Sequence, residues 1–403
     1  MGTTMGAESE ITNLAGHVAW FWRQAARGGE GVSASEWAEH VTPDAFGSQL
    51  GRLSSPETFS TSLQTGVFAG ATVGEVSRDE HGRIVAAFAT PRGLRLQAIF
   101  VGESGDAGRI RTVGCALEGG ASVSAAQAAG TRAAHWLLDE PKILDDTLAE
   151  ALAGEFAAGI IAMVRADPMV FAPRFTLAAR SRLAEETVSD AQAGADQYVL
   201  LGAGLDSFAY RRSARGDGLR IFEVDQPASQ SWKRQRLADI GVTIPESVTF
   251  VPIDFERQDL DVELSRAGFD SARPSAVAWL GVTMFLSPEA IADTLTRIAD
   301  WAAGTRLVFD YLVPERLWDG FPGWDGNLMR RIAAGWAASG EPWLSLFSPE
   351  DIEALLRAHG YDNIEDYDHD AIRSVYMGGD GSGPGPWPWT RIVRATVTGR
   401  LRS

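Results

Sequence analysis

The chain has 403 residues, enough for two or three domains, and its composition (45% hydrophobic, 22% charged) is that of an ordinary globular protein. Its formal net charge of −17 disfavours a nucleic-acid partner, because such a partner requires a basic face. The single cysteine, Cys115, excludes an internal disulfide and a cysteine-rich metal site. No stretch approaches the ~20 apolar residues of a membrane span, and the first residues lack the basic and apolar regions of a signal peptide. We therefore expect a cytoplasmic protein with neither a membrane nor a nucleic-acid partner.

The first 120 residues combine helices with a strand meander. Residues 10–26 carry apolar side chains at helical spacing, and a second helix, capped by Ser33 or Ser35, is expected to run through Val41 and end before Pro43. This order predicts a small α+β cone over residues 1–120, similar in topology to the nuclear-transport-factor-2 fold. It contains no recognisable catalytic motif, so we expect an accessory module for packing or homodimerisation, while a ligand pocket stays open as an alternative. Turn sequences separate the four predicted strands, at 71–77, 83–90, 94–102 and 109–117.

Residues 125–403 are predicted to form a second domain, after a linker at residues 119–122. Its first part, to about residue 193, is predicted to form helices that are interrupted by prolines. Strands and helices then alternate, which predicts a doubly wound, Rossmann-like α/β fold with a parallel sheet. A helix over 348–359 with a capping box at Ser348 leads to two segments, 363–368 and 391–397, that should close the sheet as an antiparallel pair. The predicted parallel strands lie near 198–202, 219–225, 248–254, 275–281 and 305–311.

A glycine turn follows the first of these strands. Gly202-Ala203-Gly204 begins a G-x-G-x-x-G pattern, but Ser207 stands in place of the third glycine and Asp206 precedes it. A dinucleotide would place its pyrophosphate at this helix start, where Asp206 would repel it. A cofactor that ends in an amino acid avoids the conflict, because an ammonium group tolerates nearby carboxylates. S-adenosylmethionine is such a cofactor.

The next two strands end in acids that suit the rest of that cofactor. Asp225, with Gln226 beside it, can accept both ribose hydroxyls about twenty residues after the turn. Asp254 can accept the adenine amino group, and Phe255 can cover the face of the base. The alternative is that these acids are only solvated strand ends. Three strand ends in register favour the cofactor site.

Six motifs resemble, in order, a known family. The resemblance is to the leucine-carboxyl-methyltransferase-like family, closest to its bacterial, actinomycete-type branch of S-adenosylmethionine-dependent methyltransferases. It covers roughly residues 128–400, implies a class I methyltransferase domain there, and leaves residues 1–120 unexplained. The motifs are "LGAGLDSFAYR", "FEVDQPASQSWKRQRL", "VPIDF", "AWLGVTMFLS", "LVFDYLVP" and "GEPWLSLFSPEDIEALLRAHGY".

The resemblance also implies further cofactor contacts. It places Arg180 on the cofactor's carboxylate, with Arg182 as the second candidate; the alternative for either is a surface salt bridge. A cationic contact from Arg132 is implied more weakly. Many members carry a glutamate after the fourth strand, where this chain has Leu280 followed by Gly281. Gly281 stays among the expected cofactor residues, whereas the cofactor's amino end loses a partner at Leu280.

The expected reaction is O-methylation of a small molecule, a carboxylate or hydroxyl of a secondary metabolite. A carboxylate acceptor is ionised already at neutral pH, whereas a hydroxyl needs a base. The candidates for a base are Asp310 and Tyr311 at a strand end, with His359 and His369 less favoured, and none forms a recognisable dyad. Two alternatives are a cofactor-binding or cyclase-like protein without methyl transfer and a nicotinamide-dependent reductase; Asp206 and the missing glycine argue against the reductase.

An aromatic-rich insert at residues 317–343 follows the fifth strand. Its side chains either pack in the core or form a lid over an apolar acceptor. The aromatic residues are Trp318, Phe321, Trp324, Trp336 and Trp343.

Overall fold

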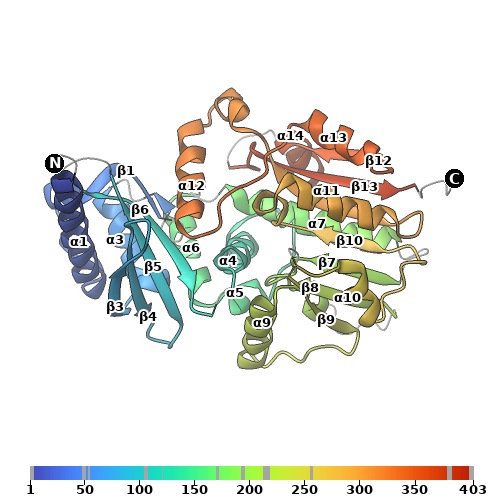
Figure 1. Cartoon of the computed structure of the whole chain (residues 1–403), viewed down its shortest axis with the longest axis horizontal. Coiled ribbons are helices and arrows are strands. Elements are labelled where there is room, and N and C mark those ends of the chain that lie inside the picture. The colour runs from blue at the N-terminus through green and yellow to red at the C-terminus, as the bar shows by residue number, and fades with distance from the viewer. Residues whose placement is uncertain are drawn as a thin grey trace. The chain divides into compact units, whose positions relative to one another are not determined.

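The computed structural model describes residues 4–47, 51–52, 55–103, 108–119, 121–168, 172–191, 196–211, 218–254, 257–378 and 384–398. The chain forms two compact units, each with its own sheet (Figure 1). Among the described helices, none combines the length and apolarity that a bilayer crossing requires. That residues 1–120 and residues 125–403 are separate domains, each able to fold independently, stays a prediction. The first unit comprises Met1–Gly130, Gly154–Val170 and Asp325–Pro342, and the second Thr131–Ala153, Phe171–Trp324 and Trp343–Ser403.

The first unit contains a six-stranded sheet in the order β2-β1-β6-β5-β4-β3. The four predicted strands are the antiparallel β3 to β6, and β1 pairs parallel with β6. The predicted second helix is too long: it ends at His40, and Val41 already begins β1, which the helical pattern concealed. The elements are α1 (Thr4–Ala26), α2 (Ala34–His40), β1 (Val41–Gly47), β2 (Gly51–Arg52), α3 (Pro56–Gln64), η1 (Gly66–Phe68), β3 (Thr72–Arg78), β4 (Ile84–Ala89), β5 (Arg95–Gly102), β6 (Ile110–Leu117), the start of α4 (Val123–Leu138), α6 (Glu155–Ala166) and α12 (Gly326–Ala338).

Aromatic side chains form the core between the helices and the sheet of this unit. Phe21 on α1 is fully buried, and its ring makes edge contacts with Phe59, Phe68 and Phe100 at centroid distances of 5.0–5.8 Å. The predicted apolar stripe of α1 is therefore the face that packs on the sheet.

Cys115 on β6 is 1% exposed, and burial raises the pKa of its thiol. The thiolate is the reactive form, so we expect Cys115 to resist thiol reagents in the native protein. In a time course with a coloured disulfide reagent, labelling should be negligible in buffer and complete in denaturant. Rapid labelling without denaturant would show that this part of the sheet opens readily.

The second unit contains a seven-stranded sheet in the order β12-β13-β11-β10-β7-β8-β9. Five strands run parallel, and β13 pairs antiparallel with β11 and β12, as predicted. The capping box at Ser348 is present. The elements are α5 (Ala149–Ala153), α7 (Pro173–Ala191), β7 (Gln197–Leu201), α8 (Phe208–Arg211), β8 (Arg220–Asp225), α9 (Pro227–Asp239), β9 (Val248–Pro252), α10 (Leu260–Arg266), β10 (Ala276–Trp279), η2 (Thr283–Phe285), α11 (Pro288–Ala299), β11 (Arg306–Leu312), η3 (Glu315–Gly320), α13 (Pro349–Ala358), β12 (Tyr361–Tyr367), α14 (His369–Ile372), the π-helical turn η4 (Arg373–Met377) and β13 (Thr390–Val397).

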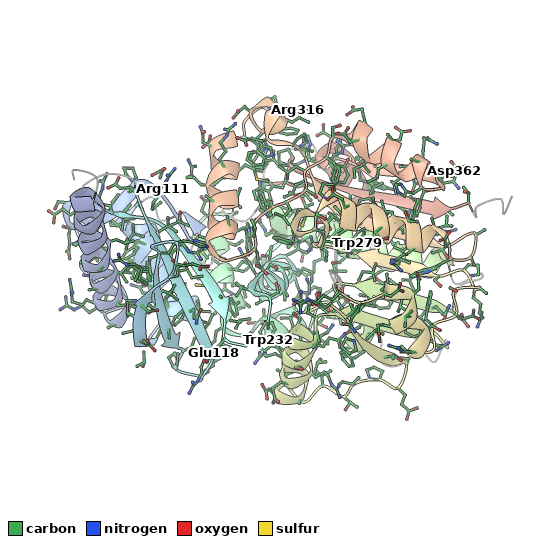
Figure 2. All side chains as sticks on the ribbon, in the orientation of Figure 1. Arg111, Glu118, Trp232, Trp279, Arg316 and Asp362 are labelled. Atoms are coloured by element: carbon green, nitrogen blue, oxygen red, sulfur yellow. The ribbon has the colours of Figure 1, made fainter. Side chains whose placement is uncertain are left out.

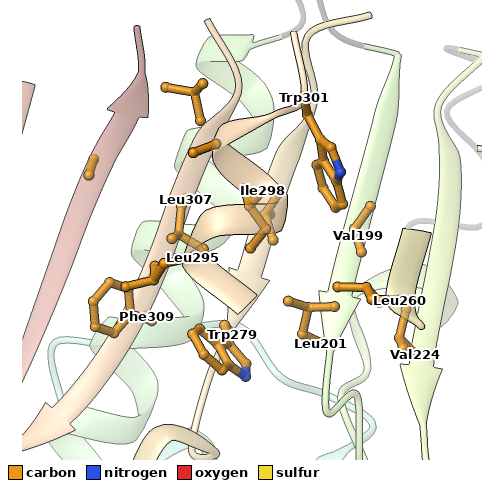
Figure 3. Close-up of a cluster of buried hydrophobic side chains, with 14 of the residues drawn as sticks. Val199, Leu201, Val224, Leu260, Trp279, Leu295, Ile298, Trp301, Leu307 and Phe309 are labelled. Atoms are coloured by element: carbon orange, nitrogen blue, oxygen red, sulfur yellow. The ribbon is translucent and has the colours of Figure 1, made fainter. Parts of the chain in front are cut away.

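Both faces of this sheet are covered, so its central strands are buried on both sides. Val199 and Leu201 belong to the cluster on the side of α10, α11 and α13, which Figure 3 shows. Tyr198 and Leu200 belong to the cluster on the side of α7 and α9. Because the five parallel strands share a direction, their carboxyl ends meet at one edge of the sheet, where an open α/β sheet binds its ligand.

Candidate functional site

The glycine turn lies at that edge, directly after β7. Gly202 and Gly204 have φ of +67° and +44°, a region that glycine adopts without the strain a side chain would suffer. The N–H groups of Gly202 and Ala203 donate to the carbonyl of Val224 on β8, at 2.8 and 3.1 Å. The turn is thereby fixed against the neighbouring strand.

Asp225 at the end of β8 holds the turn from the other side. Its carboxylate accepts the N–H of Gly204 at 2.6 Å and that of Gln226 at 2.7 Å. Burial raises the pKa of the Asp225 carboxyl, and these two hydrogen bonds act in the opposite direction. A carboxylate has about four acceptor positions, so Asp225 can still accept further hydroxyl donors.

Asp206 and Ser207, where the glycine pattern breaks down, have local partners. Asp206 accepts the N–H of Phe208 at 2.9 Å, which starts the short helix α8. Ser207 donates its hydroxyl to Asp146 at 2.6 Å. The residue in place of the third glycine is thus an anchor for the turn, made through a side chain that glycine lacks.

The buried Asp146 is the centre of this anchor, and no motif or spacing in the sequence predicts its role. It is 1% exposed and pairs with Arg132 at 2.8 Å, while Arg132 donates to the carbonyl of Leu205 at 2.8 Å. Arg211 of α8 lies 3.5 Å from the same carboxylate. Burial alone would raise the pKa of Asp146, but the two arginines and the Ser207 hydroxyl hold it below its usual value. Arg132, expected as a cofactor contact, donates instead to Asp146 and to the carbonyl of Leu205 within this anchor.

The end of β9 is joined to the end of β8, because Ile253 donates its N–H to the carbonyl of Asp225 at 2.9 Å. Asp254 is therefore placed beside Asp225 at the same edge. It is half-buried, and its carboxylate lies 3.6 Å from the exposed Arg257. Phe255, predicted to cover the adenine, lies outside the described residues.

Arg180 on α7 reaches the turn that follows β10. Its Nη1 donates to the carboxylate of Asp310 at 2.6 Å, and the other oxygen of Asp310 accepts the N–H of Gly281 at 2.6 Å. The β10 turn also contacts the glycine turn, since a Cβ at Gly202 would lie 2.4 Å from Val282 Cγ2. Arg180, Gly281 and the glycine turn are therefore neighbours. Arg182, in contrast, pairs with Glu186 on the surface at 2.6 Å.

The two candidates for a base lie on opposite faces of β11. Asp310 faces α7 and is fully buried with Arg180 and Gly281. Tyr311 faces the other cluster, and its hydroxyl donates to Asp366 of β12 at 2.6 Å. Burial raises the pKa of Tyr311, and Asp366 raises it further. Neither group is presented as a free base, and His359 binds the carbonyl of Leu355 through its Nδ1 at 2.7 Å.

Four side chains of the aromatic insert lie in the second unit among other aromatics: Trp318, Phe321, Trp324 and Trp343. Trp318 is 3% exposed and donates its indole N–H to the carbonyl of Val313. It makes an edge contact with Trp343 at 6.4 Å, and Phe321 makes one with Trp389. In this part of the insert, core packing accounts for Trp318, while a lid stays a prediction for the remainder.

A family model described as leucine carboxyl methyltransferase matches residues 125–299. A Bacillus subtilis (strain 168) protein named "Putative S-adenosyl-L-methionine-dependent methyltransferase YktD" is 30% identical over 281 residues, which are 64% of this chain and 91% of the relative. The chain belongs to the leucine carboxyl methyltransferase family. A Mycobacterium marinum relative bearing the same description is 32% identical over 260 residues, 60% of this chain and 80% of the relative.

The predictions of the family, of its bacterial branch and of the enzyme class are confirmed by these matches. Among solved structures, a DUF574-family protein from Streptomyces avermitilis has a TM-score of 0.42 and 16% identity over 66% of this chain and 96% of that chain. The side chain of Leu280, directly after β10, packs on the α7 side of the sheet.

Proposed function

We propose that this leucine carboxyl methyltransferase family member binds S-adenosylmethionine at the carboxyl edge of its second sheet. The relatives' names support this cofactor, as does the fit of the residues. The turn Gly202-Ala203-Gly204 leaves room for the ligand's approach, with Asp206 next to it. Asp225 and Gln226 would hold the ribose, Asp254 the adenine amino group, and Arg180 with Gly281 the carboxylate end. When bound, the cofactor supplies an electrophilic methyl group on a sulfonium.

We further propose that the acceptor is a carboxylate oxygen of a small molecule, a secondary metabolite being the expected class. The observation that carries this choice is Asp310, whose two oxygens are taken by Arg180 and Gly281. Tyr311 points to the other face and donates to Asp366. A carboxylate needs neither as a base: its oxygen forms the new O–CH₃ bond, the S–CH₃ bond breaks, and no proton moves. The chain's contribution is then to orient the acceptor and to exclude water.

A screen with methyl-labelled cofactor tests this choice. Small organic acids should accept label, whereas the matched primary alcohols and amides should not. Label in the alcohols alone would contradict the carboxylate assignment. Binding of the cofactor without label in any acceptor would favour the alternative of a cofactor-binding or cyclase-like protein, and tight binding of NADH instead would favour a reductase.

Replacing Asp225 with alanine should weaken cofactor binding by about 1–3 kcal/mol, the scale of lost hydrogen bonds to a charged group. The loss combines the ribose contacts with the Gly204 N–H that Asp225 now holds. Isothermal titration with S-adenosylmethionine measures it. The matched control is Asp362→Ala, since Asp362 is a strand acid on β12 at the far edge of the sheet, with a 61% exposed side chain (Figure 2). A change of only a few tenths of a kcal/mol for Asp225→Ala would remove this strand from the site.

For residues 1–120 we propose an accessory, non-catalytic cone of nuclear-transport-factor-2-like type. Support comes from the helices α1 and α2 before β1, from α3 before the meander β3 to β6, and from the parallel pairing of β1 with β6. We expect a homodimer in the cytoplasm; light scattering across a concentration series tests the association, and a monomer at all concentrations would contradict it.

A further inference from the structure

The guanidinium of Arg180 is held in one place by its surroundings. It is 8% exposed, and Nη1 lies 2.6 Å from Asp310 Oδ2. A Cβ on Gly281 would lie 2.9 Å from Nη2 and 3.0 Å from Nη1, so the guanidinium rests directly on the Gly281 backbone. Gly281 has φ of +71°, which a side chain would also disfavour. The glycine thus makes the room that Arg180 occupies.

Asp310 joins three elements at this point. Its Oδ2 binds Arg180 of α7, its Oδ1 accepts the Gly281 N–H of the β10 turn, and its own backbone carbonyl accepts the Thr283 hydroxyl at 2.6 Å. Asp310 itself is 0% exposed, within β11. A buried carboxylate with both oxygens engaged cannot easily turn to a new partner, so it fixes the direction in which the guanidinium points.

Among the described residues, only Nη1 of the Arg180 guanidinium has a hydrogen-bond acceptor. Arginine has five N–H donors in a rigid fork, so most of them stay available for a second anion. We infer that Asp310 is a positioning residue: it orients Arg180 so that the remaining donors receive the carboxylate of the cofactor's amino-acid end. This inference rests on the proposed function. It assigns Asp310 no role as a base.

The charges also balance with Asp310 in place. A zwitterionic amino-acid end brings one positive and one negative charge, and Arg180 with Asp310 adds another such pair. Asp310 is the buried acid that offsets Arg180 here. Because the guanidinium is oriented before the ligand arrives, less side-chain entropy is lost on binding.

The test compares two adenosine ligands that differ in the amino-acid end. Asp310→Asn should raise the Kd of S-adenosylhomocysteine about 10- to 50-fold, a typical scale for a charge-assisted contact. The Kd of 5′-methylthioadenosine, which lacks the carboxylate, should stay within about twofold. Arg180→Lys should show the same selective loss, and the double variant should lose little more than either single one. Arg182→Ala, a change in the surface pair with Glu186, is the matched control and should affect neither ligand.

Gly281→Ala gives an independent test that leaves Asp310 intact. Its methyl group would displace the guanidinium, so the same carboxylate-specific loss is expected. Equal losses for both ligands would make Asp310 merely structural and would overturn the inference. Normal binding with lost turnover would indicate that Asp310 acts as a base. Tighter binding of S-adenosylhomocysteine would indicate that Asp310 competes with the ligand for Arg180. Either result would also overturn the inference. If the wild-type protein binds neither ligand, the proposed function itself fails, and the inference fails with it.

Discussion

Replacing Gly204 with valine should abolish measurable binding of S-adenosylmethionine while the second unit stays folded. Gly204 has φ of +44°, where a β-branched residue is strained by about 1–3 kcal/mol. Its N–H donates to Asp225 at 2.6 Å, so a shift of the backbone would also release the acid proposed to hold the ribose. The new side chain would occupy the edge where the ligand approaches. Isothermal titration measures the affinity, and thermal unfolding measures the fold.

The control for this change is Gly304→Val. Gly304 has φ of +88° and lies before β11, at the amino end of the strands, with ordinary contacts to Pro274 at 3.9 Å. It should suffer comparable backbone strain without loss of cofactor affinity. Near-normal binding by Gly204→Val would move the cofactor away from the glycine turn.

Replacing Asp146 with asparagine should lower the free energy of unfolding by about 3–5 kcal/mol, because breaking a buried ion pair leaves a charge without compensation. Arg132, 6% exposed, would lose its partner, and Ser207 would lose its carboxylate acceptor. The glycine turn depends on both anchors, so cofactor affinity should fall as well. Urea unfolding measures the stability, with Asp293→Asn as the control: its partner, Arg297, lies in an exposed pair at 2.9 Å, and a loss below about 1 kcal/mol is expected.

The effect of Asp146 should depend on pH in a definite direction. The pKa of its carboxyl is lowered in the folded state, so its contribution is present above the unfolded pKa of about 3.9 and is lost as pH falls through the folded value. The stability difference between the wild-type protein and Asp146→Asn should therefore be largest near neutral pH and shrink in acid. A difference that is constant down to acid unfolding would mean that the charge of Asp146 does not contribute.

The α/β fold of the second unit could be read from sequence because its local signals agree. Buried parallel strands are short apolar runs, as in β7, and a proline or a capping serine marks the helix starts, as at Pro288 and Ser348. The fold of the first unit was predicted less completely from the sequence. β1 follows α2 without an intervening residue and contains Pro43, a residue that rarely indicates a strand.

The candidate site could be predicted from the sequence where it depends on backbone geometry and strand ends, as at Gly202, Gly204 and Asp225. It could not be predicted where it depends on pairs of residues that lie far apart in the sequence. Asp146 lies 61 positions from Ser207, and Arg180 lies 130 positions from Asp310, so no spacing in the sequence could join them. The separation of Asp310 from Tyr311 was available in principle, because neighbouring residues of a strand point to opposite faces.

The helix α12 completes the first unit although it is encoded long after the sheet. Its end lies directly on β6: a Cβ at Gly114 would meet Ser339 Oγ at 2.8 Å, and Cys115 donates its N–H to the same oxygen. On the ribosome, the six-stranded sheet would therefore emerge with this face uncovered, and more than two hundred further residues must be synthesised before its cover arrives. At roughly 5–20 residues per second, that interval is at least ten seconds. During this time the nascent chain must keep the side of β6 that α12 covers from pairing with other chains.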